Sequence, residues 1–341
     1  PVLVAVQGQQ TAVTAQADAL RAVFHRNRER DLLFVACGSP YYLGLSAAAF
    51  AQAHLGLRAR AIPSSDLIFF AESILPTGPQ PLTIALSRSG ETSETIAAMR
   101  AMRQRTADTI GIGCDRNTTI LKEATVPIEV VEGREQSVAQ TRSFSGMLLA
   151  AQAMVAVAAN DAILLRALSQ LPDLADEYIR RAWATAAQVI GANPIDRFFY
   201  LASGTRYGLA CEAMLKMKEM SLSHAEAFHF LEFRHGPMSM VDEHTLVVGL
   251  VSERAAEAEL AVLREMRDLG AQTMAIGESE AALRGSADVA LAFASGLPPD
   301  ARDVLYMPAV QSLAYHRAVS KGLDCDKPRH LVSYVRLPGL T

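Results

Sequence analysis

The feature that most constrains the fold of this chain is an internal repetition of its landmarks. Three of them recur in the same order with a nearly constant spacing. They are Gly38 and Gly204 after an apolar run (offset 166), Leu82–Arg100 and Leu246–Arg264 (offset 164), and Thr109–Gly113 and Thr273–Gly277 (offset 164). A constant register over three landmarks predicts that the chain is an internal duplication of one fold.

Each copy alternates short apolar runs with segments in which apolar residues recur at helical spacing. The strands expected in the first copy are 31–36, 59–62, 82–86, 109–112 and 126–130. Strands that alternate with helices predict α/β domains, each with a parallel sheet covered by helices on both faces. At about 150 residues per domain, we expect a first domain over 1–160 and a second over 161–341, with a helical stretch near 160–192 between them.

Composition excludes several classes of protein. The formal net charge is −4 and no basic run is present, which argues against a nucleic-acid-binding surface. No apolar stretch reaches the ~20 residues that span a bilayer, and Gly146–Ala159 is expected to be a buried helix. Four scattered cysteines without a CxxC pair predict neither a zinc knuckle nor a disulfide framework. No secretory signal is apparent, so we expect a cytoplasmic protein.

The run Ser-Arg-Ser-Gly-Glu-Thr-Ser at 87–93 follows an expected strand and precedes an expected helix. Backbone N–H groups and the helix dipole converge at such a junction and favour an anion. The loop adds hydroxyls from Ser87, Ser89 and Thr92, and Arg88 can grip a phosphate with two parallel hydrogen bonds. The loop is therefore predicted to bind phosphate.

Two observations bear on this prediction. Thr92 and Ser93 could simply cap the helix, although capping explains one hydroxyl rather than four. Glu91 and Glu94 would repel an anion unless their side chains turn outward. In the second copy the corresponding residues, 252–256, have lost the glycine and most of the hydroxyls, so that loop is expected not to bind phosphate.

A charged cluster is expected on a helix over 209–221. Glu212, Lys216 and Glu219 are spaced i, i+4 and i+7, which places all three on one face. The ordinary interpretation is a solvated face with an ion pair. The alternative is a functional cluster, because the helix leads directly into a segment rich in histidine.

That segment, 221–237, contains three of the eight histidines. Their spacing matches no usual zinc pattern, so neither a metal nor a cofactor is expected. His235 precedes Gly236-Pro237 in a stiff loop and is a candidate acid–base group. His224 and His229 are expected to be packed structural residues.

Seven stretches carry a resemblance to a known family. They are Ala36–Ser39, Ser87–Thr92, Ser137–Phe144, Glu212–Glu219, His224–Ala227, His235–Pro237 and Asp326–Arg329. Over nearly its whole length the chain resembles the double sugar-isomerase (SIS) domain family, including the isomerase half of glucosamine-6-phosphate synthase and the SIS-type glucosamine-6-phosphate deaminases.

The resemblance implies two tandem flavodoxin-like three-layer domains and a homodimer that binds a sugar 6-phosphate, without nucleic acid or membrane. Ser39 would join the loop in holding the phosphate. Glu219 would move a proton between C1 and C2, Lys216 would lie in the same pocket, and His235 would reach the partner's site and open the sugar ring. The implied sugar contacts are Cys37, Gly38, Val138 and Ser333.

Departures from the family refine the expected activity. Pro40 replaces a hydroxyl residue, Arg88 replaces a glutamine, and no glutaminase domain is present in the sequence. Ser333 stands where the synthase has an imine-forming lysine, so glutamine-dependent synthesis is not expected. The resemblance then implies an amino-sugar-6-phosphate deaminase/isomerase. A deglycase of sugar-amine 6-phosphates and a non-catalytic phosphosugar sensor are the alternatives.

Overall fold

The computed structural model describes residues 12–105 and 108–339 of the 341. The chain forms two compact units. The first unit takes the described residues up to Gln136, then Gln140–Pro172, and the C-terminal tail from Val332. The second takes Ser137–Ala139 and Asp173–Leu331. The boundary expected after residue 160 stays a prediction.

The first unit is built on a five-stranded parallel sheet with the order β2-β1-β3-β4-β5. Its strands are β1 (Leu32–Ala36), β2 (Ala59–Pro63), β3 (Leu82–Leu86), β4 (Thr109–Gly113) and β5 (Val126–Glu129). Every residue of β1, β3 and β4 is buried, as expected for strands covered on both faces. The strand order reverses direction between β1 and β3, as in flavodoxin-like sheets.

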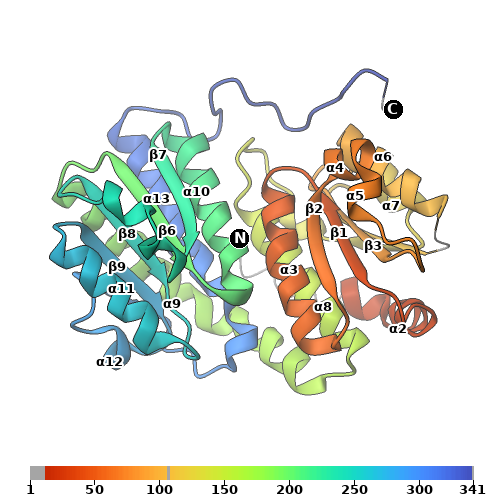
Figure 1. The fold of residues 1–341 in the computed structure, drawn as a ribbon, viewed down its shortest axis with the longest axis horizontal. Coiled ribbons are helices and arrows are strands. Elements are labelled where there is room, and N and C mark those ends of the chain that lie inside the picture. The colour runs from red at the N-terminus through yellow and green to blue at the C-terminus, as the bar shows by residue number, and fades with distance from the viewer. Residues whose placement is uncertain (1–11, 106–107, 340–341) are drawn as a thin grey trace. The chain divides into compact units, whose positions relative to one another are not determined.

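Helices cover both faces of this sheet (Figure 1). The helices of this unit are α2 (Ala17–Arg26), α3 (Ser39–Leu55), α4 (Ser64–Phe69), α5 (Ala71–Ile74), α6 (Ser93–Arg103), α7 (Thr119–Glu123) and α8 (Arg142–Ala158), and the start of α9 (Ala162–Ala192) belongs to it as well. One layer contains α3 and α8, and α4, α6 and α7 form the other. Ile96 and Met99 of α6 pack against Leu33 and Val35 in a buried cluster. The helix α8 is buried along Ser143–Val157, which confirms the buried helix expected there.

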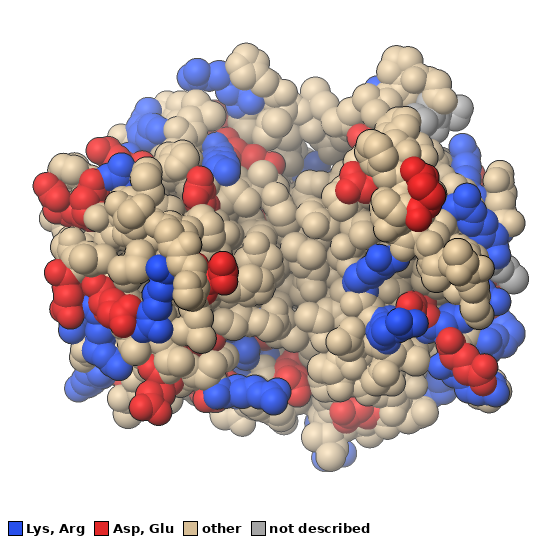
Figure 2. Space-filling model, viewed as in Figure 1, with Lys and Arg blue, Asp and Glu red and all other residues tan. Residues whose placement is uncertain are grey.

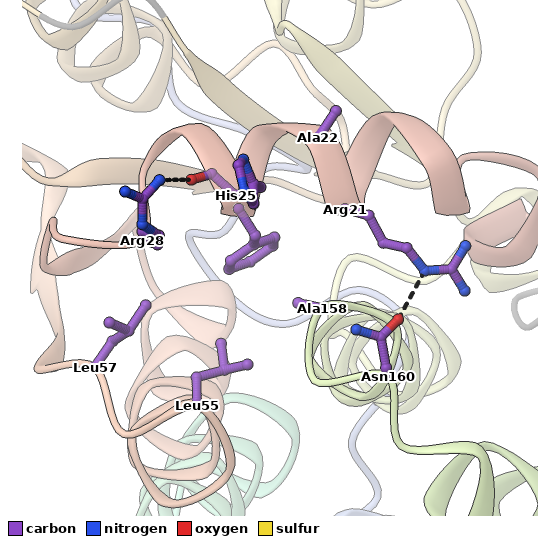
Figure 3. A pocket seen from close by; sticks show the side chains of 9 residues that line it. Arg21, Ala22, His25, Arg28, Leu55, Leu57, Ala158 and Asn160 are labelled. Carbon is purple, nitrogen blue, oxygen red and sulfur yellow. Dashed lines mark hydrogen bonds between the residues drawn. The ribbon is translucent and has the colours of Figure 1, made fainter.

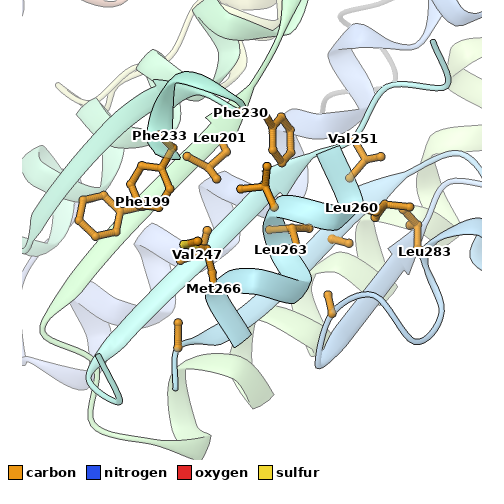
Figure 4. Packing of buried hydrophobic residues seen from close by; sticks show 14 of the residues in the cluster. Phe199, Leu201, Phe230, Phe233, Val247, Val251, Leu260, Leu263, Met266 and Leu283 are labelled. Carbon is orange, nitrogen blue, oxygen red and sulfur yellow. The ribbon is translucent and has the colours of Figure 1, made fainter. Parts of the chain in front are cut away.

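The second unit repeats this plan with the parallel order β10-β9-β8-β6-β7. Its strands are β6 (Arg197–Ala202), β7 (His224–His229), β8 (Thr245–Leu250), β9 (Gln272–Gly277) and β10 (Val289–Ala292). Its helices are the rest of α9, α10 (Tyr207–Ser221), α11 (Ala256–Asp268), α12 (Glu280–Leu283) and α13 (Met307–Ser320). On the α11 face, Leu263 and Met266 pack against Val247 and Phe199 (Figure 4).

The two sheets have the same topology when β6–β10 are matched to β1–β5. Strand ends keep the register seen in the sequence, since Ala36 and Ala202 are 166 apart, and Leu86 and Leu250 are 164 apart. The predicted fold, two α/β domains with parallel sheets related by duplication, is confirmed. Neither β7 nor β10 was named as a strand from the sequence, and the β7 sequence HAEAFH lacks an apolar run.

Two features of the structure concern nucleic-acid binding and membrane insertion, which were not expected from the composition. Lys and Arg are interspersed with Asp and Glu over the face shown in Figure 2. Among residues 12–105 and 108–339, no helix is both long enough and apolar enough to span a bilayer.

Candidate functional site

The first unit collects its candidate residues at the carboxyl ends of β1 and β3. These strands are neighbours, with Leu32 beside Leu82, and the chain leaves them toward opposite layers, into α3 and α6. Ligands of open α/β sheets bind where adjacent strands lead to opposite faces. Residues 37–39 and 87–92, which follow these two strands, therefore occupy the expected ligand-binding position of the first unit.

The predicted phosphate loop is held in shape by its own hydroxyls. Ser87 Oγ accepts a hydrogen bond from the Gly90 amide at 3.1 Å and lies 3.3 Å from Thr92 Oγ1. Ser89 Oγ accepts one from the Glu91 amide at 3.2 Å. Ser87 and Ser89 are both buried. The loop is therefore an ordered turn that ends at the start of α6.

Gly90 is required by this turn for two reasons. Its φ is +65°, a region that L-residues with side chains enter only at a cost. A Cβ built on it would also lie 2.1 Å from Thr118 Oγ1 and 2.5 Å from Thr118 Cβ.

We therefore expect Gly90→Ala to lower the free energy of unfolding by roughly 2–4 kcal/mol, the sum of backbone strain and overpacking. Urea denaturation measures this loss. Gly78→Ala is the matched control, since a Cβ there meets no atom within 4 Å. Equal stability of the two variants would contradict the requirement.

The carboxylate of Glu91 is turned toward α7. Its oxygens accept hydrogen bonds from the Thr119 amide at 2.7 Å and from Thr119 Oγ1 at 3.0 and 3.2 Å. A carboxylate at a helix N-terminus is stabilised by the free amides and the dipole. The side chain of Glu91 thus has a partner of its own in α7. Glu94 accepts a hydrogen bond from Ser93 Oγ at 3.3 Å.

Arg88 connects the loop to the C-terminal tail within the first unit. Its guanidinium donates to the Ser333 carbonyl at 2.9 Å and lies 3.9 Å from Glu135 Oε1, and its side chain is buried. The tail also contacts the start of α6, where the Ser93 amide donates to Val335 O at 3.3 Å. The structure thus brings together two predicted site residues, Arg88 and Ser333. The roles assigned to them in binding phosphate and sugar stay predictions.

Glu135 is a residue near this loop that sequence reasoning missed. Its carboxylate accepts hydrogen bonds from the amides of Thr141, Arg142 and Ser143, at 3.2, 3.0 and 3.3 Å. These amides begin α8, so Glu135 caps that helix. The signal in the sequence was an acidic residue shortly before a long apolar helix.

The β1 side of the first unit carries Cys37, Gly38 and Ser39. Gly38 has φ +62° and is the N-cap of α3, and Ser39 begins that helix and is buried. Cys37 Sγ lies 3.7 Å from Thr95 Oγ1. Burial raises the pKa of the Cys37 thiol, so this side chain is a neutral thiol at physiological pH.

The second unit contains the predicted charged cluster on α10. Lys216 Nζ lies 3.4 Å from Glu212 Oε1 and contacts Glu219 Oε2. The side chains of Glu212 and Lys216 are fully buried, whereas 19 % of Glu219 is exposed. The interpretation as a solvated helix face is therefore wrong. A buried cation holds a partly exposed carboxylate in place, an arrangement suited to a general base.

Two histidines of the second unit are more exposed than expected. His224 and His229 are exposed, so the prediction that they are packed is wrong; they lie at the two ends of the edge strand β7. The His229 ring stacks on Tyr207 with centroids 3.8 Å apart. His235 is exposed after a short helical turn, Glu232–Arg234. Val138, predicted to contact sugar, donates its amide to the Asp326 carbonyl at 3.1 Å.

A cavity of about 530 Å³ lies elsewhere in the first unit (Figure 3). It is lined from α2 and from the C-terminal ends of α3 and α8, including Arg21, Phe24, Leu55 and Asn160. Arg21 Nε donates to Asn160 Oδ1 at 3.0 Å across it. None of the candidate residues above lines this cavity. In the part of the chain that the structure describes, no group of three His, Cys, Asp or Glu side chains is placed to hold a metal ion.

Comparison with known proteins defines the class. The SIS domain model matches residues 27–157 and 193–299, so the chain belongs to the SIS domain family. A glutamine–fructose-6-phosphate aminotransferase (isomerizing) of Halobacterium salinarum is 32 % identical over 89 % of this chain and 51 % of its own. The chain thus spans about half the length of the curated relatives that it matches.

Solved structures of similar fold cover nearly the whole chain. The glucosamine-6-phosphate deaminase of Thermotoga maritima is 30 % identical, with a TM-score of 0.79 over 96 % of this chain and 99 % of its own. The tagatose-6-phosphate ketose/aldose isomerase of Escherichia coli has a TM-score of 0.81 over 94 % and 93 %, at 24 % identity, which is a likeness of fold alone.

Proposed function

We propose that this protein is a phosphosugar isomerase that acts on 6-phosphosugars, and specifically an amino-sugar-6-phosphate deaminase. The observation that carries the proposal is the partly exposed carboxylate of Glu219 beside the buried Lys216. The similarity to the Thermotoga maritima deaminase, which extends over nearly all of both chains, favours an amino-sugar substrate.

The reaction proceeds by proton transfer in the open-chain sugar. Glu219 removes the proton from C2 of a 2-amino-2-deoxyaldose 6-phosphate and returns it to C1. The electron pair of the C2–H bond forms the C1=C2 bond of an enolamine, and the former aldehyde oxygen takes up a proton from water. Protonation of C1 then leaves a CH₂OH group, and loss of one N–H proton to water turns the C2 amine into a ketimine. Water then adds to the ketimine and ammonia leaves, which yields a ketose 6-phosphate.

This chemistry needs no amine from the enzyme, because the substrate carries its own nitrogen. Ser333 at the position of the family's imine-forming lysine is consistent with that requirement. The loop over 87–92 binds the phosphate through Ser87, Ser89, Thr92 and backbone amides, with Ser39 at the start of α3. His235 opens the sugar ring as an acid, from the second chain of a homodimer.

The test is incubation of the protein with glucosamine 6-phosphate, with ammonia and fructose 6-phosphate both assayed. We expect the two products in equal amounts, and no stimulation by added glutamine. A parallel incubation with a fructose-amine 6-phosphate tests the deglycase. Binding of the sugar phosphates without turnover would contradict the enzyme and identify a sensor.

A further inference from the structure

The second unit contains a close counterpart of the phosphate loop at the end of β8. The Val251 amide donates to the Ile276 carbonyl at 2.8 Å, just as the Ser87 amide donates to the Ile112 carbonyl at 3.1 Å. Val251 stands 164 positions after Ser87, and Ile276 stands 164 positions after Ile112. The backbone therefore leaves β8 along the path by which it leaves β3.

A buried carboxylate occupies the position beside this second loop. Glu259 of α11 is 1 % exposed, and its Oε2 accepts a hydrogen bond from the Ser252 amide at 2.6 Å. At the same offset of 164, the first unit has Thr95, whose hydroxyl contacts Ser64 and Cys37. A threonine is too short to reach a loop amide from this position, whereas a glutamate is long enough.

Ordinary helix capping does not describe this contact. Ala255 is the N-cap of α11, and a capping glutamate bonds back to the amide of its own N-cap residue. Glu259 instead reaches Ser252, which lies between β8 and the helix. Burial raises the pKa of Glu259, and the Ser252 amide, the Ser252 and Ser203 hydroxyls and Arg206 oppose that rise. These donors and the cation favour the ionised carboxylate, whereas burial favours the neutral acid. The geometric observation is the 2.6 Å hydrogen bond from the Ser252 amide to the buried carboxylate.

We infer that the second unit retains an anion site at the end of its sheet and that the chain's own Glu259 fills it. Its ligand class is a small carboxylate, supplied here from within the fold. One consequence is that the loop after β8 takes no external anion, because the Glu259 carboxylate already occupies the position beside it. This inference does not depend on the proposed function, because it concerns a site that takes no substrate.

Chemical rescue of Glu259→Ala tests the inference, with thermal unfolding as the readout. The variant should have a Tm lower than the wild-type value by about 5 °C or more, since a buried hydrogen-bonded group is lost. Formate or acetate should raise the Tm of this variant by several degrees more than chloride at the same ionic strength, because a ligand that binds the folded state stabilises it. In the wild-type protein and in Glu259→Gln the side chain at position 259 fills the site. Their Tm should therefore be the same in formate or acetate as in chloride.

Glu265→Ala is the matched control, because Glu265 lies on the same helix and pairs with Arg234 at the surface. Its Tm should respond to formate as the wild-type Tm does. Should Glu259→Ala not fold, Glu259→Thr, which copies the first unit, carries the same test. An equal effect of formate and acetate on wild-type protein and on the folded variant would overturn the inference.

Discussion

Replacing Glu219 with glutamine should lower kcat by a factor on the order of 10² or more, as the loss of a positioned general base does. Glutamine has nearly the same shape, and its amide oxygen can still accept a hydrogen bond from Lys216. It cannot take the proton from C2, so the loss should appear in kcat with little change in KM. Steady-state assays of ammonia release from glucosamine 6-phosphate measure both constants.

Glu219 is the informative residue of this cluster to replace, because its two charged neighbours are buried. Glu212 and Lys216 are fully buried, so Glu219 is the member of the cluster with exposed surface. Glu243→Gln is a suitable control, because Glu243 is an exposed glutamate of the same unit. A change in kcat of less than threefold for Glu219→Gln would remove Glu219 from the proposed mechanism. A loss confined to KM would instead assign it to substrate binding.

The fold could be predicted because burial dominates its sequence pattern. Strands covered on both faces appear as apolar runs, and the duplication supplied an independent register for them. That register also contained the signal for β7, which was missed, since β2 begins at Ala59 and β7 at His224, 165 positions later. The run HAEAFH is polar because β7 is an edge strand. Local composition alone therefore could not reveal it.

The candidate site was predictable only in part. A turn rich in hydroxyl side chains and glycine can be located from the sequence alone. The directions of its side chains cannot, because they depend on partners far away in the chain. Arg88 contacts Ser333, 245 positions later, and Glu91 contacts Thr119. A helical repeat likewise places Glu212 and Lys216 on one face without showing whether that face meets water. Tertiary packing determines which side chains meet and which helix face is buried, and the periodicity of the sequence does not contain that information.

Replacing Lys216 with methionine should lower the free energy of unfolding by about 3–5 kcal/mol, the usual cost of removing one partner from a buried ion pair. Methionine has a similar length and fills the same volume, so packing changes little. The loss is electrostatic, because the ammonium 3.4 Å from Glu212 disappears from the interior. Turnover should fall as well, since the contact that orients Glu219 is lost. Urea denaturation followed by circular dichroism measures the first effect.

Two further variants separate charge from packing on the same helix. Lys218 is exposed on α10, so Lys218→Met should change the free energy of unfolding by no more than about 0.5 kcal/mol. Adding Glu212→Gln to Lys216→Met should recover part of the lost stability, because a neutral amide replaces a carboxylate whose neighbouring cation is gone. A cost below about 1 kcal/mol for Lys216→Met, or no recovery in the double variant, would mean that the buried charges of α10 do not depend on one another.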